Sequence, residues 1–209
     1  VTGSKYLVEA AGSRVLVDCG LFQGLKKLRE RNWSEFPVDP SKLDAVVLTH
    51  AHIDHTGYLP ALIKNGFRGP VYCTSPTLDL LKIMLPDAGY LQEEEARYAN
   101  RKGYTKHDPA RPLYTKRDAD DALKQLVPVD FDEEFEPADG IRTKLVSAGH
   151  ILGAARLDLV SGDTKVTFSG DVGRPSDILM RPPMPIKTTD YLVLESTYGN
   201  RRHEETSPW

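Results

Sequence analysis

The sequence contains few cysteines and no long hydrophobic run. Its two cysteines among 209 residues, Cys19 and Cys73, each lie inside a short apolar segment. They are typical of small buried residues, and not of a disulfide framework or of zinc ligands. This cysteine usage fits a reducing compartment, so we expect a cytoplasmic protein. No apolar run approaches membrane-spanning length, and we expect no membrane partner.

The sequence also lacks a strong charge of one sign. It has 27 Lys and Arg residues against 30 Asp and Glu residues, which gives a formal net charge of −3. This balance argues modestly against broad nucleic-acid binding without excluding it. Basic residues do gather locally, and solvated helix or loop faces explain these clusters most simply. They lie at Lys26-Lys27 with Arg29 and Arg31, at Arg97, Arg101 and Lys102, and at Arg201-Arg202.

Histidine, in contrast, is concentrated in one place. Three of the six histidines fall in the segment Thr49-His50-Ala51-His52-Ile53-Asp54-His55, directly after the apolar run 45–48. Imidazole nitrogens and carboxylate oxygens are the donors that hydrolytic zinc prefers. Two residues apart in extended chain, His50 and His52 point to the same side, while Asp54 and His55 follow at the turn into a helix. The segment therefore predicts a metal site, and a histidine-rich surface loop is the simpler alternative.

This His-x-His-x-Asp-His pattern resembles the metallo-β-lactamase superfamily, and the resemblance covers nearly the whole chain. Three further motifs resemble that superfamily in the correct order, each at the end of an apolar strand. They are Asp18 in Val15-Leu16-Val17-Asp18-Cys19-Gly20, His150 in Ser147-Ala148-Gly149-His150, and Asp171 in Phe168-Ser169-Gly170-Asp171. The resemblance implies an α/β fold, a four-layer αββα sandwich with helices outside two central sheets.

The resemblance also implies how the ligands divide between two zinc ions. The first zinc would be held by His50, His52 and His150, and the second by Asp54 and His55, with Asp171 bridging the two. Two such ions bind a shared water, lower its pKa and stabilise the oxyanion that develops on the substrate.

Two aspartates are expected to have supporting roles. Asp18 would hydrogen-bond a ligand histidine and fix its ring orientation, with a buried structural aspartate as the alternative. Asp54 would also orient the nucleophilic hydroxide.

A further segment resembles one branch of the superfamily. Glu195-Ser196-Thr197-Tyr198-Gly199 is similar to the first motif of the β-CASP enzymes, which process RNA or, in some branches, DNA. Segments 2–4, 18–24 and 98–103 are also similar to bacterial members of this branch. The resemblance implies a zinc-dependent ribonuclease that hydrolyses single-stranded RNA by metal-activated water. Glu195 would pair with a histidine that protonates the leaving oxygen.

The same resemblance predicts the domain organisation. We expect a metallo-β-lactamase core at residues 1–194 and the start of a β-CASP insertion at 195–209, where the chain stops. The fold would then be incomplete at its C-terminus, without the partner histidine of Glu195 and without the last ligand of the second zinc. His107 and His203 are interpreted as surface loop residues. We therefore expect a truncated piece of a longer nuclease, weak or inactive alone.

Other functions stay open at this point. DNA is the nearest rival substrate, and endonuclease and exonuclease action are not distinguished. A thioesterase-like hydrolase would not need the Glu195 segment, and an inactive scaffold subunit would have lost metal ligands that are present here. A homodimer is also left open.

The order of apolar runs and turn residues predicts interleaved strands and helices. Strands are expected at 5–10, 14–18, 43–48, 71–74, 142–147, 157–160, 165–168 and 191–194. Helices are expected at 56–65, after a cap at Ser75, from 93–95 to about Gly103, and after Thr115, which would form a capping box with Asp118. The charged segment 87–126 is expected beside the site, covering one of its edges.

Overall fold

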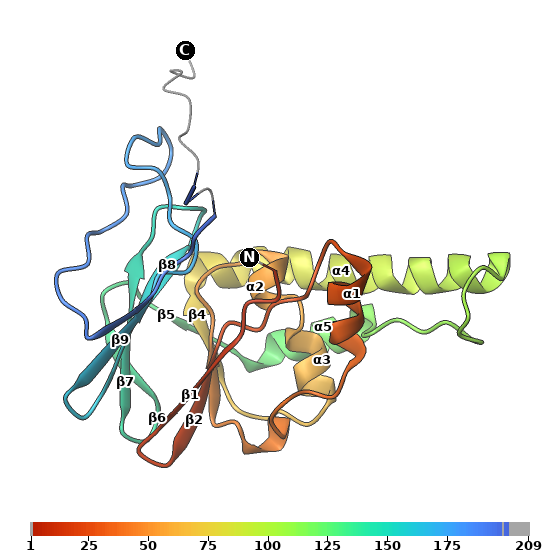
Figure 1. Cartoon of the computed structure of the whole chain (residues 1–209), viewed down its shortest axis with the longest axis horizontal. Helices are drawn as coiled ribbons and strands as arrows, with labels where there is room; N and C mark the ends of the chain where they lie inside the picture. The colour runs from red at the N-terminus through yellow and green to blue at the C-terminus, as the bar shows by residue number, and fades with distance from the viewer. Residues whose placement is uncertain (1, 198, 201–209) are drawn as a thin grey trace.

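The computed structural model describes residues 2–197 and 199–200. Tyr198, Arg201, Arg202 and His203, which entered the sequence predictions, lie outside the described residues. Two five-stranded sheets stand at the centre of the described chain, and the helices gather beside one of them (Figure 1).

The first sheet is mostly parallel. Its strands, in spatial order, are β1 (Tyr6–Ala10), β2 (Ser13–Val17), β3 (Ala45–Val47), β4 (Val71–Thr74) and β5 (Leu126–Val129). Only the β1–β2 pair is antiparallel. Strands β2 and β3 are buried on both faces, as their continuous apolar sequences predict.

The second sheet is mostly antiparallel. Its strands, in spatial order, are β10 (Tyr191–Val193), β9 (Thr164–Phe168), β8 (Ala155–Ser161), β7 (Ile141–Ser147) and β6 (Glu134–Ala138). Only β10 runs parallel to its neighbour, β9. All of the predicted strands are present, with bounds that differ by a few residues at most.

Two hydrophobic cores hold these layers together, and the period of two along β2 divides its side chains between them. Val15 and Val17 point toward the second sheet, where they pack with residues such as Leu157 and Phe168. Leu16 points the other way, into the core between the first sheet and the helices.

The helices are α1 (Lys26–Arg29), α2 (Ile53–Thr56), α3 (Leu59–Lys64), α4 (Ser75–Lys102) and α5 (Lys116–Ala122), with short 3-10 turns η1 (Glu30–Trp33), η2 (Pro40–Lys42) and η3 (Leu123–Gln125). Between residues 126 and 197 the described chain has no helix, so the helical layer of the described part lies on one side of the two sheets. None of the helices in this part combines the length and the apolar composition that crossing a bilayer requires.

The helix predicted at 56–65 is divided in two, and that prediction is wrong in this respect. The backbone N–H of Tyr58 donates to the carbonyl of Cys19 at 2.9 Å instead of continuing the helix. Helix α3 then begins at Leu59, and Pro60 fits in its first turn because the N–H that proline lacks has no partner there.

The two helices expected on either side of residue 90 are one helix, α4, of 28 residues. Its N-cap is Thr74, whose side chain accepts from the N–H of Thr77, and not Ser75 as predicted. Pro86 costs about 3 kcal/mol in a helix interior, but burial of Leu81, Leu85 and Gly89 on one side of the helix offsets that cost.

Helix α5 begins with the predicted capping box. Thr115 N donates to Asp118 Oδ2 at 2.8 Å, and Asp118 N donates to Thr115 Oγ1 at 3.1 Å. The helix packs against α3 and α4. The segment 87–126 therefore extends the helical layer, and the far end of α4 points away from the sheets, so it does not cover the site (Figure 1).

Candidate metal centre

The predicted site residues follow the C-terminal ends of β2, β3, β7 and β9, with Asp54 and His55 in the short helix α2. Thr49 and His50 follow β3, Asp18 follows β2, His150 follows β7 and Asp171 follows β9. Because β2 and β3 run parallel, their carboxyl ends open at one edge. The packing of the second sheet on the first then brings the other two loops to that edge.

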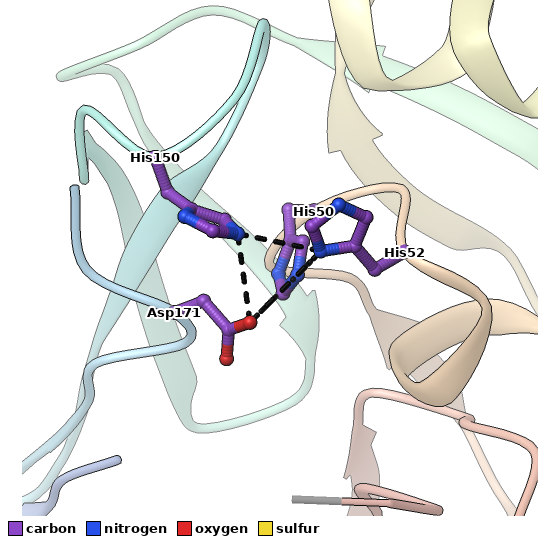
Figure 2. Close-up of side chains that lie close together, drawn as sticks. All are labelled: His50, His52, His150 and Asp171. Atoms are coloured by element: carbon purple, nitrogen blue, oxygen red, sulfur yellow. Dashed lines mark hydrogen bonds and ion pairs between the residues drawn. The ribbon is translucent and has the colours of Figure 1, made fainter. Parts of the chain in front are cut away.

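Four side chains converge there with one donor atom each. The ligand atoms of His50, His52, His150 and Asp171 all lie within 4.8 Å of one another (Figure 2). Nδ1 of His52 is 3.1 Å from Nε2 of His50 and 3.3 Å from Nε2 of His150. Asp171 Oδ2 is 3.6, 3.9 and 3.5 Å from the same atoms of His50, His52 and His150.

These separations fit a divalent ion at the centre. Donors placed about 2.1 Å from a tetrahedral zinc ion lie about 3.4 Å from one another. The distances between each histidine and the carboxylate are longer than good hydrogen bonds, as expected when the donors are arranged around a common point. The side chain of His50 is 1% exposed and that of His52 is 44% exposed, so the cluster can be reached from the His52 side.

His55 lies on the opposite side of Asp171. Its ring is buried, with Nδ1 2.8 Å from Oδ2 of Asp18 and Nε2 3.3 Å from Oδ1 of Asp171. Nε2 is fully enclosed yet makes no hydrogen bond. When Nδ1 donates to Asp18, Nε2 faces a carboxylate oxygen, and a second ring proton or a cation between the two atoms would relieve this contact.

The pKa values of the site report the same demand for positive charge. Burial opposes protonation of His55, but Asp171 and Asp18 together raise its pKa to about 10. Burial would raise the pKa of Asp171, but its contacts with His50, His52 and His55 hold that pKa far below the usual range. The pKa of His150 is lowered, by burial and by the neighbouring His50.

Asp18 supports two histidines from behind. It is buried, with a left-handed backbone at φ 59°. Its Oδ1 accepts from Thr49 N at 2.8 Å and from Thr49 Oγ1 at 3.0 Å. Because a carboxylate only accepts, the Thr49 hydroxyl donates to Asp18, and Oγ1 is left to accept from Nδ1 of His50, 3.0 Å away. Nε2 of His50, which faces the cluster, then carries no proton.

Thr49 is the residue that the sequence predictions did not identify as functional. It is buried between Asp18 and His50 and contacts both. Its place directly before the first histidine, at the end of a buried strand, is the signal that could have identified it.

Helix α2, which carries Asp54, is held by the loop that follows β2. Asp54 is half-buried and is not one of the four clustered residues, and its backbone carbonyl accepts from Ser4 N at 2.8 Å. A Cβ at Gly20 would lie 1.6 Å from that carbonyl oxygen. Cys19 N also donates to the carbonyl of His55 at 2.6 Å, so α2 and this loop lie in direct contact.

Glu195 lies beside the Asp171 loop, just after β10. Its Oε1 accepts from Val172 N at 2.6 Å, and its own N–H donates to Ser169 Oγ at 3.0 Å. It lines a small cavity together with Asp18, His55 and Asp171. Of the other histidines, His107 is exposed in the loop after α4, away from this cavity.

Comparison with known proteins matches the family model of the metallo-beta-lactamase superfamily over residues 2–200. The chain is 38% identical over 204 residues to Ribonuclease TTHA0252 of Thermus thermophilus, covering 97% of this chain and 42% of the relative. It is 34% identical to Transcription termination factor FttA of Cenarchaeum symbiosum, covering 94% of this chain and 29% of the relative. It is 29% identical to Cleavage and polyadenylation specificity factor 73 of Drosophila melanogaster, covering 97% of this chain and 28% of the relative. The chain therefore spans less than half the length of each of these relatives.

Proposed function

The chain belongs to the metallo-β-lactamase superfamily, in its β-CASP branch, and on this basis we propose that it is the catalytic core of a zinc-dependent ribonuclease. The family and the α/β two-sheet fold predicted from the motifs are confirmed. The names of the relatives, a ribonuclease and a cleavage factor among them, support RNA as the substrate.

The observation that carries the proposal is the position of Asp171 between two sets of histidines. Oδ2 faces His50, His52 and His150, while Oδ1 faces the enclosed Nε2 of His55. We propose that His50, His52 and His150 hold one zinc ion, that Asp54 and His55 hold a second, and that Asp171 bridges them. Such a pair of ions supplies a water of lowered pKa and stabilises the charge that develops on the phosphate.

The remaining residues of the site position these groups. Asp18 and Thr49 hold the ring protons of His55 and His50 on Nδ1, so that both Nε2 atoms face Asp171. In this proposal Asp54 orients the attacking water. Glu195, fixed by Val172 N next to the Asp171 loop, supports the group that protonates the leaving ribose oxygen.

The buried free cysteines Cys19 and Cys73 fit the cytoplasmic location that we propose for this enzyme. A single strand of RNA suits the site better than a duplex, because a flexible strand can present one phosphate to a metal cluster reached from the His52 side. DNA of the same form is the rival substrate.

The test uses the full-length gene product and labelled single-stranded RNA, with single-stranded DNA, a β-lactam and a thioester as competing substrates. Asp171→Asn should abolish RNA cleavage, because the bridging carboxylate is lost. Glu195→Gln should slow cleavage about 100-fold or more while the protein keeps its metal, since proton delivery is impaired and not ligation. Asp163→Asn, an exposed carboxylate in the turn between β8 and β9, is the matched control and should behave as the parent.

Rapid thioester or β-lactam hydrolysis without any nuclease activity would contradict the proposal. Cleavage of DNA in preference to RNA would support the proposed metal chemistry and contradict RNA as the substrate.

A further inference from the structure

The far end of α4 carries a group of basic and aromatic side chains outside the metal centre. We call residues 97–111 the α4 tip; they comprise the end of the helix and the loop that follows it. This short segment has five Lys or Arg residues and a single acidic residue, although the whole chain has a net charge of −3. The five are Arg97, Arg101, Lys102, Lys106 and Arg111. Arg97 pairs with Glu94, and the other four make the tip a local positive patch on an acidic protein.

Two tyrosines of the tip are exposed side by side. Tyr98 is 48% exposed and Tyr104 is 62% exposed, and their ring centroids are 6.0 Å apart. The guanidinium of Arg101 lies 5.6 Å from the centre of the Tyr98 ring. Arg101 lies over one face of Tyr98, and the exposure of both rings leaves them accessible to a ligand.

The loop of the tip is held in place by one side chain. Asn100 Nδ2 donates to the carbonyl of Ala110 at 2.9 Å, and Ala110 N donates to Asn100 Oδ1 at 2.7 Å. Gly103 ends the helix with a left-handed φ of 64°, which turns the chain back. The two tyrosines therefore stand in a preformed arrangement, which lowers the entropy cost of binding.

The tip is remote from the metal centre. The first turn of α4 contacts the loop of His150, where Thr74 and Thr77 donate to the carbonyl of Gly153 at 2.7 and 3.0 Å. A helix of 28 residues is about 42 Å long. Figure 1 shows the far end of α4 beyond the rest of the helical layer. The tip cannot be part of the metal cluster.

We propose that the α4 tip binds a single strand of RNA, with bases stacked on Tyr98 and Tyr104 and phosphates held by Arg101, Lys102 and Lys106. Exposed aromatic rings flanked by cations are the means by which proteins bind single strands without reading their sequence. A duplex would present no open base to the tyrosines. The choice of RNA as the nucleic acid rests on the proposed function, and the binding surface itself rests on the charge and the aromatic pair.

The test measures fluorescence anisotropy of a labelled 12-nucleotide uridine RNA with the whole 209-residue chain in a chelator, so that no cleavage occurs. The double variant Tyr98→Ala/Tyr104→Ala should raise Kd about 10-fold or more, because each stacked base is lost. Arg101→Gln/Lys102→Gln should reduce the slope of log Kd against log salt by about 1.4, as two phosphate contacts disappear. Tyr90→Ala, which removes another exposed tyrosine of the same helix, should bind as the parent.

Two results would overturn the inference. One is equal affinity of the parent and both double variants, with thermal unfolding showing that all are folded. The other is no measurable binding of the RNA to the parent, which would leave a protein partner as the explanation for the tip.

His150→Ala separates this inference from the proposed function, since that variant should lose cleavage in the full-length product and keep its binding at the tip. RNA cleavage by the full-length product together with RNA binding that the tip variants do not change contradicts only the inference, and tip-dependent binding without any RNA cleavage contradicts only the proposed function.

Discussion

Oδ2 of Asp18 accepts a hydrogen bond from Nδ1 of His55 at 2.8 Å, and this contact turns Nε2 of the same ring toward Asp171. The two residues are 37 positions apart, one after β2 and the other in α2. Both are buried, so the pair is protected from water on all sides. The orientation of a proposed metal ligand is thus decided by a carboxylate that does not face the ion.

Asp18→Asn should weaken metal binding without removing a ligand. Asparagine fits the left-handed backbone of this position. It has only one acceptor oxygen, and its NH2 group donates, so it cannot accept from both Thr49 and His55 as the two carboxylate oxygens do. We expect metal affinity at the His55 side to fall 10- to 100-fold and the free energy of unfolding to fall by about 1–3 kcal/mol. Competition with a chromophoric chelator and denaturant unfolding measure the two effects. Unchanged affinity would show that Asp18 has only a structural role.

The purified chain should retain about one zinc ion after dialysis against a mild chelator, because His50, His52, His150 and Asp171 supply four donors at one point. The second ion should be held more weakly. His150→Ala should release the retained zinc, and His107→Ala should not. Metal analysis by mass spectrometry decides this, and a His150→Ala protein that keeps as much zinc as the parent contradicts the ligand assignment.

Gly20→Ala should displace helix α2, which carries Asp54. The added Cβ would lie 1.6 Å from the Asp54 carbonyl oxygen, so α2 and the loop after β2 must separate. We expect a loss of about 3 kcal/mol or more in the free energy of unfolding, and weaker metal binding with it. Gly24→Ala is the control, because its Cβ meets open space and only its φ of 76° is unfavourable, a cost of about 1 kcal/mol. Equal losses in the two variants would show that the close approach is not important.

Stability at low pH should depend on Asp158, which is well removed from the metal ligands. Burial would raise its pKa, but Lys165 at 3.1 Å, Arg156 at 3.2 Å and Thr167 at 3.0 Å lower it. A carboxyl with a lower pKa in the folded state stabilises the fold above its unfolded pKa of about 3.9, and this stabilisation is lost as the pH falls through the folded pKa.

The free energy of unfolding of Asp158→Asn in a chelator should therefore fall less between pH 7 and pH 3 than that of the parent, by about 1 kcal/mol. Denaturant unfolding at each pH provides the measurement. Asp79→Asn, an exposed carboxylate paired with Lys82 on α4, should show the same fall as the parent. An equal fall in the free energy of unfolding of all three proteins would contradict the role of Asp158.

Local sequence signals predicted the elements that depend on neighbouring residues. The capping box of Thr115 and Asp118 needs only residues three apart, and it was predicted correctly. The failures occurred where distant contacts intervened. Helix α4 continues through Pro86 with one side buried, and on that side a Cβ at Gly89 would lie 2.8 Å from the backbone of Thr115. The break before α3 follows from the hydrogen bond between Tyr58 and Cys19, which no local rule contains.

The chemistry of the candidate site was present in the sequence by itself, because the types of donor and their short spacing in 50–55 are local properties. The apolar runs located most of the strands in the same way, and the motifs with their family resemblance supplied the two-sheet architecture. Only the tertiary structure decided that His150 and Asp171 meet those histidines, that Thr49 and Asp18 orient the rings, and that Tyr98 and Tyr104 are exposed at the end of a long helix. These relationships depend on how strands pair and on how two sheets pack, and they form between residues far apart in the chain, whose interactions local sequence preferences do not specify.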